Sequence, residues 1–331
     1  MKRNFLFNLP YYIGRPPNLL WSRGWYGISD IAGDGSILYR AQRTERRTMD
    51  LKALIGKAGL IWLRLGSSAW HKGKPADVIT FANQVSGNLG GNYVLVTTDG
   101  DMSVPGELPI KDVEKILADE NLKAWFTQNY DGSIVHPKLK PIPVGLDLHT
   151  GSRGESIRPK KKTKWFIDAL NRKKKAEERI NKIWSDVHFK RNPGRHGDPR
   201  GDIQEPIGSG RLESTVDTPH SRLSHKEIWS RYGEYRFVLS LPGAAVEAHR
   251  TWEALALGAV VITVHTSLDD LLRPYRVIFL DQTKPMWWAR LGDKRWLAEA
   301  ATKAAAGRNL DLSWEYWEEI ARSPLAVQNC S

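Results

Sequence analysis

The chain has little cysteine and no long apolar run, and each shortage excludes a class of protein. Its 331 residues include one cysteine, Cys330, so the sequence offers neither internal disulfides nor a cysteine metal cluster. No apolar run approaches the roughly 20 residues that a membrane-spanning helix needs. The apolar patch within residues 1–17 is short and bounded by proline, unlike a secretion signal. We therefore expect a cytoplasmic protein without a membrane span.

The length suits two domains better than one. A chain of 331 residues exceeds an ordinary single domain, whereas two domains of roughly 150 residues can each bury a core. Strand-like apolar runs alternate with helical patterns, an order typical of parallel sheets. We predict an α/β protein with two Rossmann-like domains and a cleft between them. The predicted parts are residues 1–156, residues 157–310, and a helix over residues 311–331 that crosses back.

Hydrophobic periodicity and turn residues place the elements in both halves. In the first half, strands are predicted over residues 60–65, 93–98, 124–127 and 140–145, and helices over 76–85 and 110–119. In the second half, after a linker over 157–163, we predict strands over 164–170 and 187–190, a helix over 174–185 and a loop over 192–216. Ser224 and Glu227 have capping-box spacing, so a helix should begin there. Further helices are predicted over 295–306 and 314–321.

Positive charge is concentrated in one tract of the chain. The formal net charge is +12, and residues 158–200 hold fifteen Lys or Arg against five Asp or Glu. Such a tract attracts phosphates and by itself would suggest nucleic acid. No zinc finger or aromatic RNA-binding signature accompanies it, so nucleic acid is not expected as a partner. Two interpretations stay open: a solvated helix face with a basic loop, or attraction of an anionic ligand.

Residues 236–279 order a strand, a glycine turn, a helix and a second strand in one run. Gly243 lies in the turn, the helix is predicted over 247–257, and Gly258 suits its C-terminus. In such a unit the ligand binds at the carboxyl ends of the strands, beside the helix N-terminus. His249 and Arg250 lie in the first turn of the helix, where free N–H groups and the helix dipole favour an anion.

The same helix carries groups for both parts of a nucleotide. The guanidinium of Arg250 would make two charge-assisted bonds to a phosphate. Glu253, three residues later, shares nearly the same helix face and can accept bonds from the hydroxyls of a ribose. The residues therefore suggest a nucleotide-diphosphate site. For His249, the alternative is that it caps the helix or packs.

The run SLPGAAVEAHRTWEALALG resembles the C-terminal signature of exostosin-like glycosyltransferases. The residues that keep the family spacing are His249, Arg250, Trp252, Glu253, Ala254, Leu255 and Gly258. Ala244, Ala245 and Glu247 depart from the signature, which has a small polar residue or glycine and an aspartate there. The runs LVTTDGDMSVP, WFTQNYD and KLKPIPVGLDLHT also resemble this family, so the similarity covers about residues 93–320.

The resemblance implies a fold of the GT-B type. It also implies transfer of a sugar from a nucleotide-sugar, with a UDP-sugar as the preferred donor, to a glycan or glycoprotein, with inversion at the anomeric carbon. It implies no metal cofactor, because the helix dipole and basic side chains can neutralise the leaving diphosphate. The residues that it places at the nucleotide-sugar are Gly243, Glu247, His249, Arg250, Glu253 and Arg179. The alternative is a basic module without catalysis that binds polyanionic glycan or nucleic acid, and a nucleotidase is a further alternative.

Polar groups that follow predicted strands in the first half are candidates for the acceptor side. Asp99 and Asp101 could act as the general base that removes the proton of the acceptor hydroxyl, or they could only close a turn. The candidates for binding sugar hydroxyls are Gln128, Asn129 and Asp131, which could equally form a polar loop. Asp147 and His149 have the spacing of a metal-binding pair, but no further ligand lies near them in the sequence, so no metal site is predicted.

Overall fold

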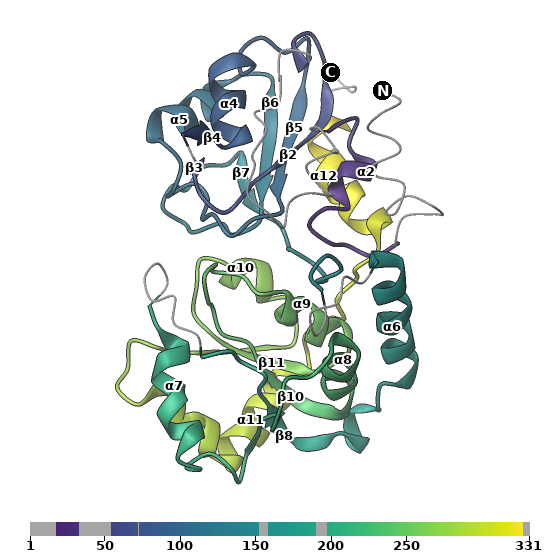
Figure 1. The fold of residues 1–331 in the computed structure, drawn as a ribbon, viewed down its shortest axis with the longest axis vertical. Coiled ribbons are helices and arrows are strands. Elements are labelled where there is room, and N and C mark those ends of the chain that lie inside the picture. Colours follow the sequence, from purple (N-terminus) through teal and green to yellow (C-terminus); the bar gives the residue numbers. More distant parts are fainter. Residues whose placement is uncertain (1–17, 33–53, 72, 152–157, 190–196, 327–331) are drawn as a thin grey trace. The chain divides into compact units, whose positions relative to one another are not determined.

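The computed structural model describes residues 18–32, 54–71, 73–151, 158–189 and 197–326. The chain divides into two compact units, one of Met1–Val144 with Leu312–Ser331 and one of Gly145–Asp311. Each unit contains a five-stranded parallel sheet with helices (Figure 1), which confirms the predicted α/β class. Cys330, the apolar patch of residues 1–17 and Ile157 of the predicted linker lie outside the described residues.

The sheet of the first unit follows the order of the chain. Its spatial order is β1-β2-β5-β6-β7, and every neighbouring pair is parallel. The strands are β1 (Ile31–Ala32), β2 (Gly59–Arg64), β5 (Tyr93–Thr98), β6 (Leu122–Thr127) and β7 (Leu139–Pro141). A small antiparallel pair, β3 (Trp70–His71) and β4 (Lys74–Pro75), lies outside this sheet. Among the described strands, the direction of progress across the sheet never reverses.

Helices cover both faces of this first sheet. Ile61, Leu95 and Trp125 share a core cluster with α4 (Asp77–Gln84) and α5 (Ile110–Ala118). Because side chains alternate along a strand, their neighbours in sequence point to the opposite face, where α12 packs against β2, β5 and β6. That helix, α12 (Trp314–Ala326), belongs to the first unit although its residues follow the whole of the second, and Trp314 packs on Trp25 of α2 (Trp25–Ile28).

The sheet of the second unit reverses its direction once. Its spatial order is β12-β11-β10-β8-β9, again parallel throughout. The strands are β8 (Ile180–Trp184), β9 (Val216–Asp217), β10 (Tyr235–Leu239), β11 (Val260–Val264) and β12 (Val277–Leu280). The chain passes from β8 to β9 on one side and returns on the other side of β8 as β10. A crevice for a ligand is expected where the order reverses, at the carboxyl ends of β8 and β10.

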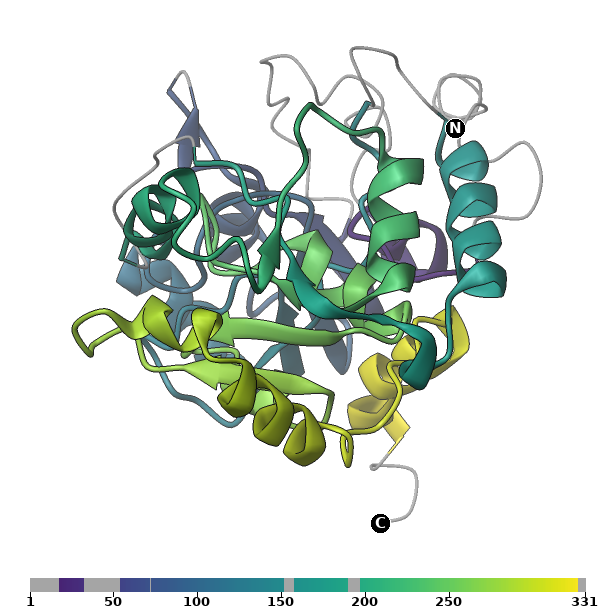
Figure 2. The ribbon, with the colours of Figure 1, turned by 90° about the horizontal axis from the view of Figure 1, so that it is seen from below.

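Two layers of helices enclose the second sheet (Figure 2). Its helices are α6 (Pro159–Arg172), α7 (Pro199–Gly208), α8 (His225–Glu234), α9 (His249–Ala256), α10 (Asp269–Leu272) and α11 (Lys294–Ala304). Ile203 of α7 and Leu297 of α11 join one core cluster with Phe237 and Ile262 of the strands. On the other face α8 packs against β8 and β10, α9 packs against β11, and α6 covers α8.

Three predicted elements at the start of the second unit are wrong: the strand over 164–170, the helix over 174–185, and the strand over 187–190, whose described residues 187–189 form no strand. The strand predicted over 164–170 lies in α6, whose buried Lys162, Thr163 and Phe166 recur at helical spacing. The helix predicted over 174–185 is a short 3-10 turn, Ala176–Glu178, followed by β8, in which only the last two residues are buried. The first half of the segment predicted as a helix is mostly exposed and charged, so its sequence also fitted the pattern of a solvated helix.

The predicted loop over 192–216 contains α7 within its described part. Asp198 caps this helix by accepting a bond of 2.9 Å from the backbone N–H of Gly201, and Pro199 occupies its first turn. These are helix-start signals, but the glycines and prolines around them outweighed them in the sequence-based interpretation.

Most other predicted elements are confirmed within a few residues. Strand β5 occupies its predicted residues, and α9 ends just before Gly258, which has a φ of +84°. Ser224 and Glu227 form the predicted capping box at the start of α8. No helix among the described residues is both long enough and apolar enough to cross a membrane.

Candidate functional site

The candidate site lies at the N-terminus of α9 in the second unit. This helix begins at His249, after β10 and the loop of residues 240–248. Ser240, which follows β10, bonds through its hydroxyl to that of Thr251 at 2.7 Å, and this contact ties the helix start to the strand end. A small cavity beside them is lined by Leu241, Glu247 and Thr263, among others. The helix N-terminus is therefore held next to the reversal in the sheet.

Arg250 makes its main contacts with Asp186, which follows β8. Its Nε lies 3.2 Å from Oδ1 of Asp186, and its Nη2 donates to the backbone oxygen of Asp186 at 3.2 Å. Burial alone would lower the pKa of Arg250, but Asp186 and Tyr232 raise it above its usual value. Its Nη1 is buried and finds no acceptor with hydrogen-bond geometry among the described residues. The side chain of Tyr232 is a further partner of the guanidinium, so Arg250 is held from α8 as well as by Asp186.

A second arginine, Arg200 of α7, lies in the same electrostatic environment. It donates from Nε and Nη2 to the backbone oxygen of Leu241, at 3.2 and 2.9 Å. Burial and the nearby charge of Arg250 lower its pKa to about 10, although Asp186 acts against them. Burial and the arginines also lower the pKa of His188. Asp186 thus faces two partly buried arginines, and Asp198 is a further carboxylate beside Arg200.

Gly243 gives the space that Arg200 occupies. A Cβ atom on residue 243 would lie 2.6 Å from the guanidinium carbon of Arg200, so any larger residue would displace that side chain. The family resemblance placed Gly243 at the nucleotide-sugar, and this role stays a prediction. In the structure the group that approaches its backbone is Arg200.

His249 and Glu253 hold the segment that opens the second unit. The Nδ1 atom of His249 lies 2.8 Å from the backbone oxygen of Gly145, and Oε1 of Glu253 accepts a 3.0 Å bond from the backbone N–H of Asp147. Glu253 is buried, and Lys162 of α6 is fully buried nearby. Burial would raise the pKa of Asp147, but the surrounding His149, histidines of α8 and α9, and Lys162 hold it well below its usual range.

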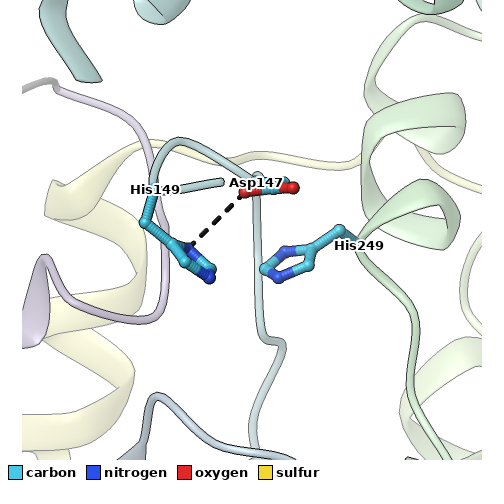
Figure 3. Close-up of side chains that lie close together, drawn as sticks. All are labelled: Asp147, His149 and His249. Carbon is cyan, nitrogen blue, oxygen red and sulfur yellow. Dashed lines mark ion pairs between the residues drawn. The ribbon is translucent and has the colours of Figure 1, made fainter. Parts of the chain in front are cut away.

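The structure also brings Asp147 and His149 next to His249 (Figure 3). One ligating atom from each of these three side chains lies within 4.8 Å of those of the other two. The prediction of no metal site considered only residues that are close in sequence, and His249 is far from the other two. This group is the candidate for a metal in the described part of the chain.

Arg179 and Glu247 have contacts within the protein. Arg179 precedes β8, at the opposite end of this strand from Asp186, and donates to the backbone oxygens of Lys174, Tyr232, Tyr235 and Leu257. These carbonyls include those at the C-terminal ends of α8 and α9, so Arg179 caps helices. Oε1 of Glu247 accepts a 2.5 Å bond from Nε1 of Trp252. A role of either residue in binding a nucleotide-sugar stays a prediction.

In the first unit, the two candidate aspartates differ in their surroundings. Asp99 is 4% exposed, and its two carboxylate oxygens accept bonds from Nε of Arg23 at 2.8 Å and Nε of Arg64 at 2.7 Å. Asp101 is exposed at the end of the same loop. Of the two candidates for a general base, only Asp101 is open to an acceptor.

The predicted sugar-binding residues mainly hold loops together. Gln128 accepts from the backbone N–H of Asp99 at 2.9 Å and donates to the oxygen of Gly100, to which Asn129 also donates at 2.8 Å. Asp131 accepts from the backbone N–H groups of Gly106 and Ser133. Binding of an acceptor by Gln128, Asn129 and Asp131 stays a prediction.

Sequence reasoning missed Asp186, Arg200 and His188. The end of β8 was hidden because this strand was interpreted as a helix, and α7 because it was interpreted as a loop. Lys162 was counted as one of a charged run, although the helical spacing of α6 was a signal for its burial.

A scan against models of protein families finds no match, and a search of curated proteins finds none. Among solved structures, the chain is similar to AviGT4, a glycosyltransferase involved in avilamycin A biosynthesis, at 12% identity over 82% of this chain and 98% of that chain, with a TM-score of 0.32. It is similar to sucrose-phosphate synthase from Thermosynechococcus elongatus at 14% identity over 81% and 68%, with a TM-score of 0.34. An alpha-glucosyltransferase in complex with UDP and DNA matches at 10% identity over 82% of each chain, with a TM-score of 0.35. Likenesses of this size carry no argument about the reaction, which has to rest on the site.

Proposed function

We propose that this protein is a glycosyltransferase that uses a nucleotide-sugar, with UDP-sugars as the first class to test. The observation that supports the proposal is a pair of partly buried arginines near the N-terminus of α9, Arg250 and Arg200, whose positive charges act on each other beside Asp186. A diphosphate would offset this repulsion, and guanidinium groups bind it through charge-assisted bonds. The position of this cluster at the reversal of a parallel sheet also favours a nucleotide ligand.

The exostosin-like signature adds the sugar to this nucleotide site. It covers the same turn and helix, from Ser240 to Gly258, and implies transfer with inversion to a glycan or glycoprotein. Arg250 and Arg200 would hold the diphosphate, and the dipole of α9 would stabilise the leaving group. No metal is assigned to this step, because the protein's own cations supply the charge.

For the acceptor, we propose Asp101 as the general base. A base has to meet the hydroxyl that it deprotonates, and Asp101 is exposed, whereas Asp99 is buried between two arginines. Transfer then forms a bond from the acceptor oxygen to the anomeric carbon, breaks the bond to the diphosphate, and leaves the proton on the base.

A thermal-stability screen with UDP- and GDP-sugars tests the nucleotide half. A ligand at 100 times its dissociation constant should stabilise the protein by about 2.7 kcal/mol. Release of free nucleotide is then measured with and without candidate acceptors. Release that needs an acceptor supports transfer, whereas equal release without one identifies a nucleotidase. No stabilisation by any nucleotide-sugar would contradict the proposal.

A second candidate function rests on the outer face of α6. Lys160, Lys161, Lys164 and Arg172 are exposed along this helix, which suits a module that binds a polyanionic glycan or nucleic acid. Its affinity for heparin or single-stranded DNA would fall steeply with salt. Reversing these four charges should abolish such binding, and should leave binding of a nucleotide-sugar at α9 intact.

A further inference from the structure

Three side chains that can ligate a metal converge in the second unit from two distant parts of the sequence. Asp147 and His149 lie in the segment after Gly145, and His249 is the first residue of α9. One ligating atom from each of the three lies within 4.8 Å of those of the other two, and Figure 3 shows the two rings side by side below the carboxylate. All three are partly buried, so an ion could enter from solvent and exchange part of its water for protein ligands.

Hydrogen bonds prepare His249 to act as a ligand. Its Nδ1 lies 2.8 Å from the backbone oxygen of Gly145. A carbonyl oxygen only accepts, so Nδ1 carries the proton in the neutral ring, and the lone pair of Nε2 is left for a metal. Histidines that bind metals usually donate their other ring N–H in this way, which fixes the tautomer and the ring orientation.

The carboxylate of Asp147 is oriented in a similar manner. Its Oδ1 accepts a 2.9 Å bond from the backbone N–H of Thr150, and its Oδ2 lies 3.2 Å from Nε2 of His225. Each oxygen has a second lone pair, so these contacts hold the plane of the carboxylate without using all of its capacity to bind a cation. Such outer contacts are typical of metal sites.

The formal charges around the group leave a negative excess. Two carboxylates lie here, because Glu253 accepts a 3.0 Å bond from the backbone N–H of Asp147. The one ammonium among them, that of Lys162, lies 3.5 Å from Oδ1 of Asp147 and donates to the oxygen of Thr150 at 3.0 Å. Counted apart from the histidines, two carboxylates thus face one ammonium, and a cation would compensate the second negative charge.

We propose that Asp147, His149 and His249 bind one divalent transition-metal ion, with zinc as the best match. Two imidazole nitrogens and one carboxylate oxygen suit zinc, cobalt or iron, whereas magnesium and calcium prefer oxygen ligands throughout. Three protein ligands leave a coordination position open, as in catalytic rather than structural zinc sites. The inference does not depend on glycosyl transfer, because it rests on these ligands alone.

Metal titration of the full-length protein tests this site. After dialysis against a chelator, Zn²⁺ is titrated by calorimetry, and Co²⁺ by the visible absorption of its protein-bound form. We expect one ion per chain, and each of His149→Ala and His249→Ala should weaken binding at least about tenfold. His265→Ala is the matched control, because His265 also pairs with a carboxylate of the same unit, that of Asp269 at 2.5 Å, and should bind as the parent does.

Two results would overturn the metal site: no binding of either ion by the parent protein, or parental affinity in the variant that lacks both His149 and His249. Circular dichroism checks that each variant is folded, and His149→Asn replaces any histidine variant that unfolds. UDP is titrated in parallel. Arg250→Ala should lose UDP affinity and keep zinc, and His149→Ala should lose zinc and keep UDP. If the parent binds zinc but no nucleotide, the proposed function fails and the metal site stands.

Discussion

The two sheets place the same charged group at the carboxyl end of a strand, an aspartate beside two arginines. In the first unit Asp99 follows β5, and both of its oxygens bond to the Nε atoms of Arg23 and Arg64. In the second unit Asp186 follows β8 and pairs with Arg250, and Arg200 contributes its charge from α7. Asp198 and Glu253 add carboxylates near the second group, and the two arrangements differ in which bonding groups they leave available.

Topology explains the difference. The first sheet runs in chain order, so among its described strands the loops at its edge lie side by side, and Gln128 and Asn129 tie them together. The second sheet reverses between β8 and β10, and a crevice for a ligand is expected at such a reversal. Arg250 has a buried Nη1 without an acceptor there. We therefore expect strand order, rather than the aspartate and arginines alone, to decide which sheet binds a ligand at its carboxyl end.

The largest effect on turnover is expected for Asp101→Asn, which tests whether the loops at the carboxyl end of the first sheet carry a catalytic group. Loss of a general base should lower turnover by roughly 100- to 10,000-fold and leave nucleotide affinity nearly unchanged. Initial rates of nucleotide release and UDP calorimetry measure the two quantities. Glu114→Gln is the control, because Glu114 is an exposed carboxylate on α5 and should lose little turnover. Equal small losses of turnover in both variants would mean that Asp101 is not the general base.

Asp99→Ala should cost the most stability. Removing one partner of a buried ion pair costs about 3–5 kcal/mol, and here it leaves Arg23 and Arg64 facing each other. The free energy of unfolding in urea should fall by that amount for the transition of the first unit. Asp101→Ala, at an exposed site in the same loop, should change it by less than about 0.5 kcal/mol. Similar values for both variants would contradict the structural role of Asp99.

Arg250→Ala tests nucleotide binding at the carboxyl end of the second sheet. Loss of a charge-assisted contact to phosphate should cost about 1.5–3 kcal/mol of UDP binding, which is roughly tenfold or more. Calorimetry measures it beside Arg295→Ala, an exposed arginine of α11 that pairs only with Glu299 in the described structure and should bind UDP as the parent does. If Arg64→Ala weakens UDP as much as Arg250→Ala, strand order does not locate the ligand and the comparison fails.

The smallest effect is expected for Ser224→Ala. Ser224 accepts from the backbone N–H of Glu227, which bonds back to Ser224 at 2.7 Å, and α8 supports α9. Loss of an N-cap side chain costs about 1 kcal/mol. Thermal unfolding should show this loss with unchanged UDP affinity. A large fall in UDP affinity would mean that the start of α8 helps to position the nucleotide-binding residues of α9.

Local patterns predicted the parts of the fold that local forces decide. Strand β5 is an apolar run buried along its whole length, and α9 follows a glycine turn and stops at Gly258. Helix α6 was predicted as a strand and β8 as a helix, because Lys-rich exposed segments carry little periodic signal. Packing of α6 against α8 and pairing of β8 with β10 determine their secondary structure.

The candidate site could be predicted only in part for the same reason. Arg250 was identified from its place in the first turn of α9. Its partner Asp186 and its neighbour Arg200 come from elements that were misassigned. His249 could not be related to Asp147 from spacing, because only the folded chain brings α9 against the segment after Gly145.

The return of α12 to the first unit sets an order of events during synthesis. Leu20 donates its backbone N–H to the oxygen of Leu312, and Arg322 of α12 bonds to Asp30 at 2.8 Å. The ribosome therefore has to produce all of Gly145–Asp311 before the first unit can acquire its last helix. Synthesis adds about 5–20 residues per second. The second unit therefore has many seconds to fold before α12 is made and can pack on the second face of the first sheet. The unit that begins first is completed last.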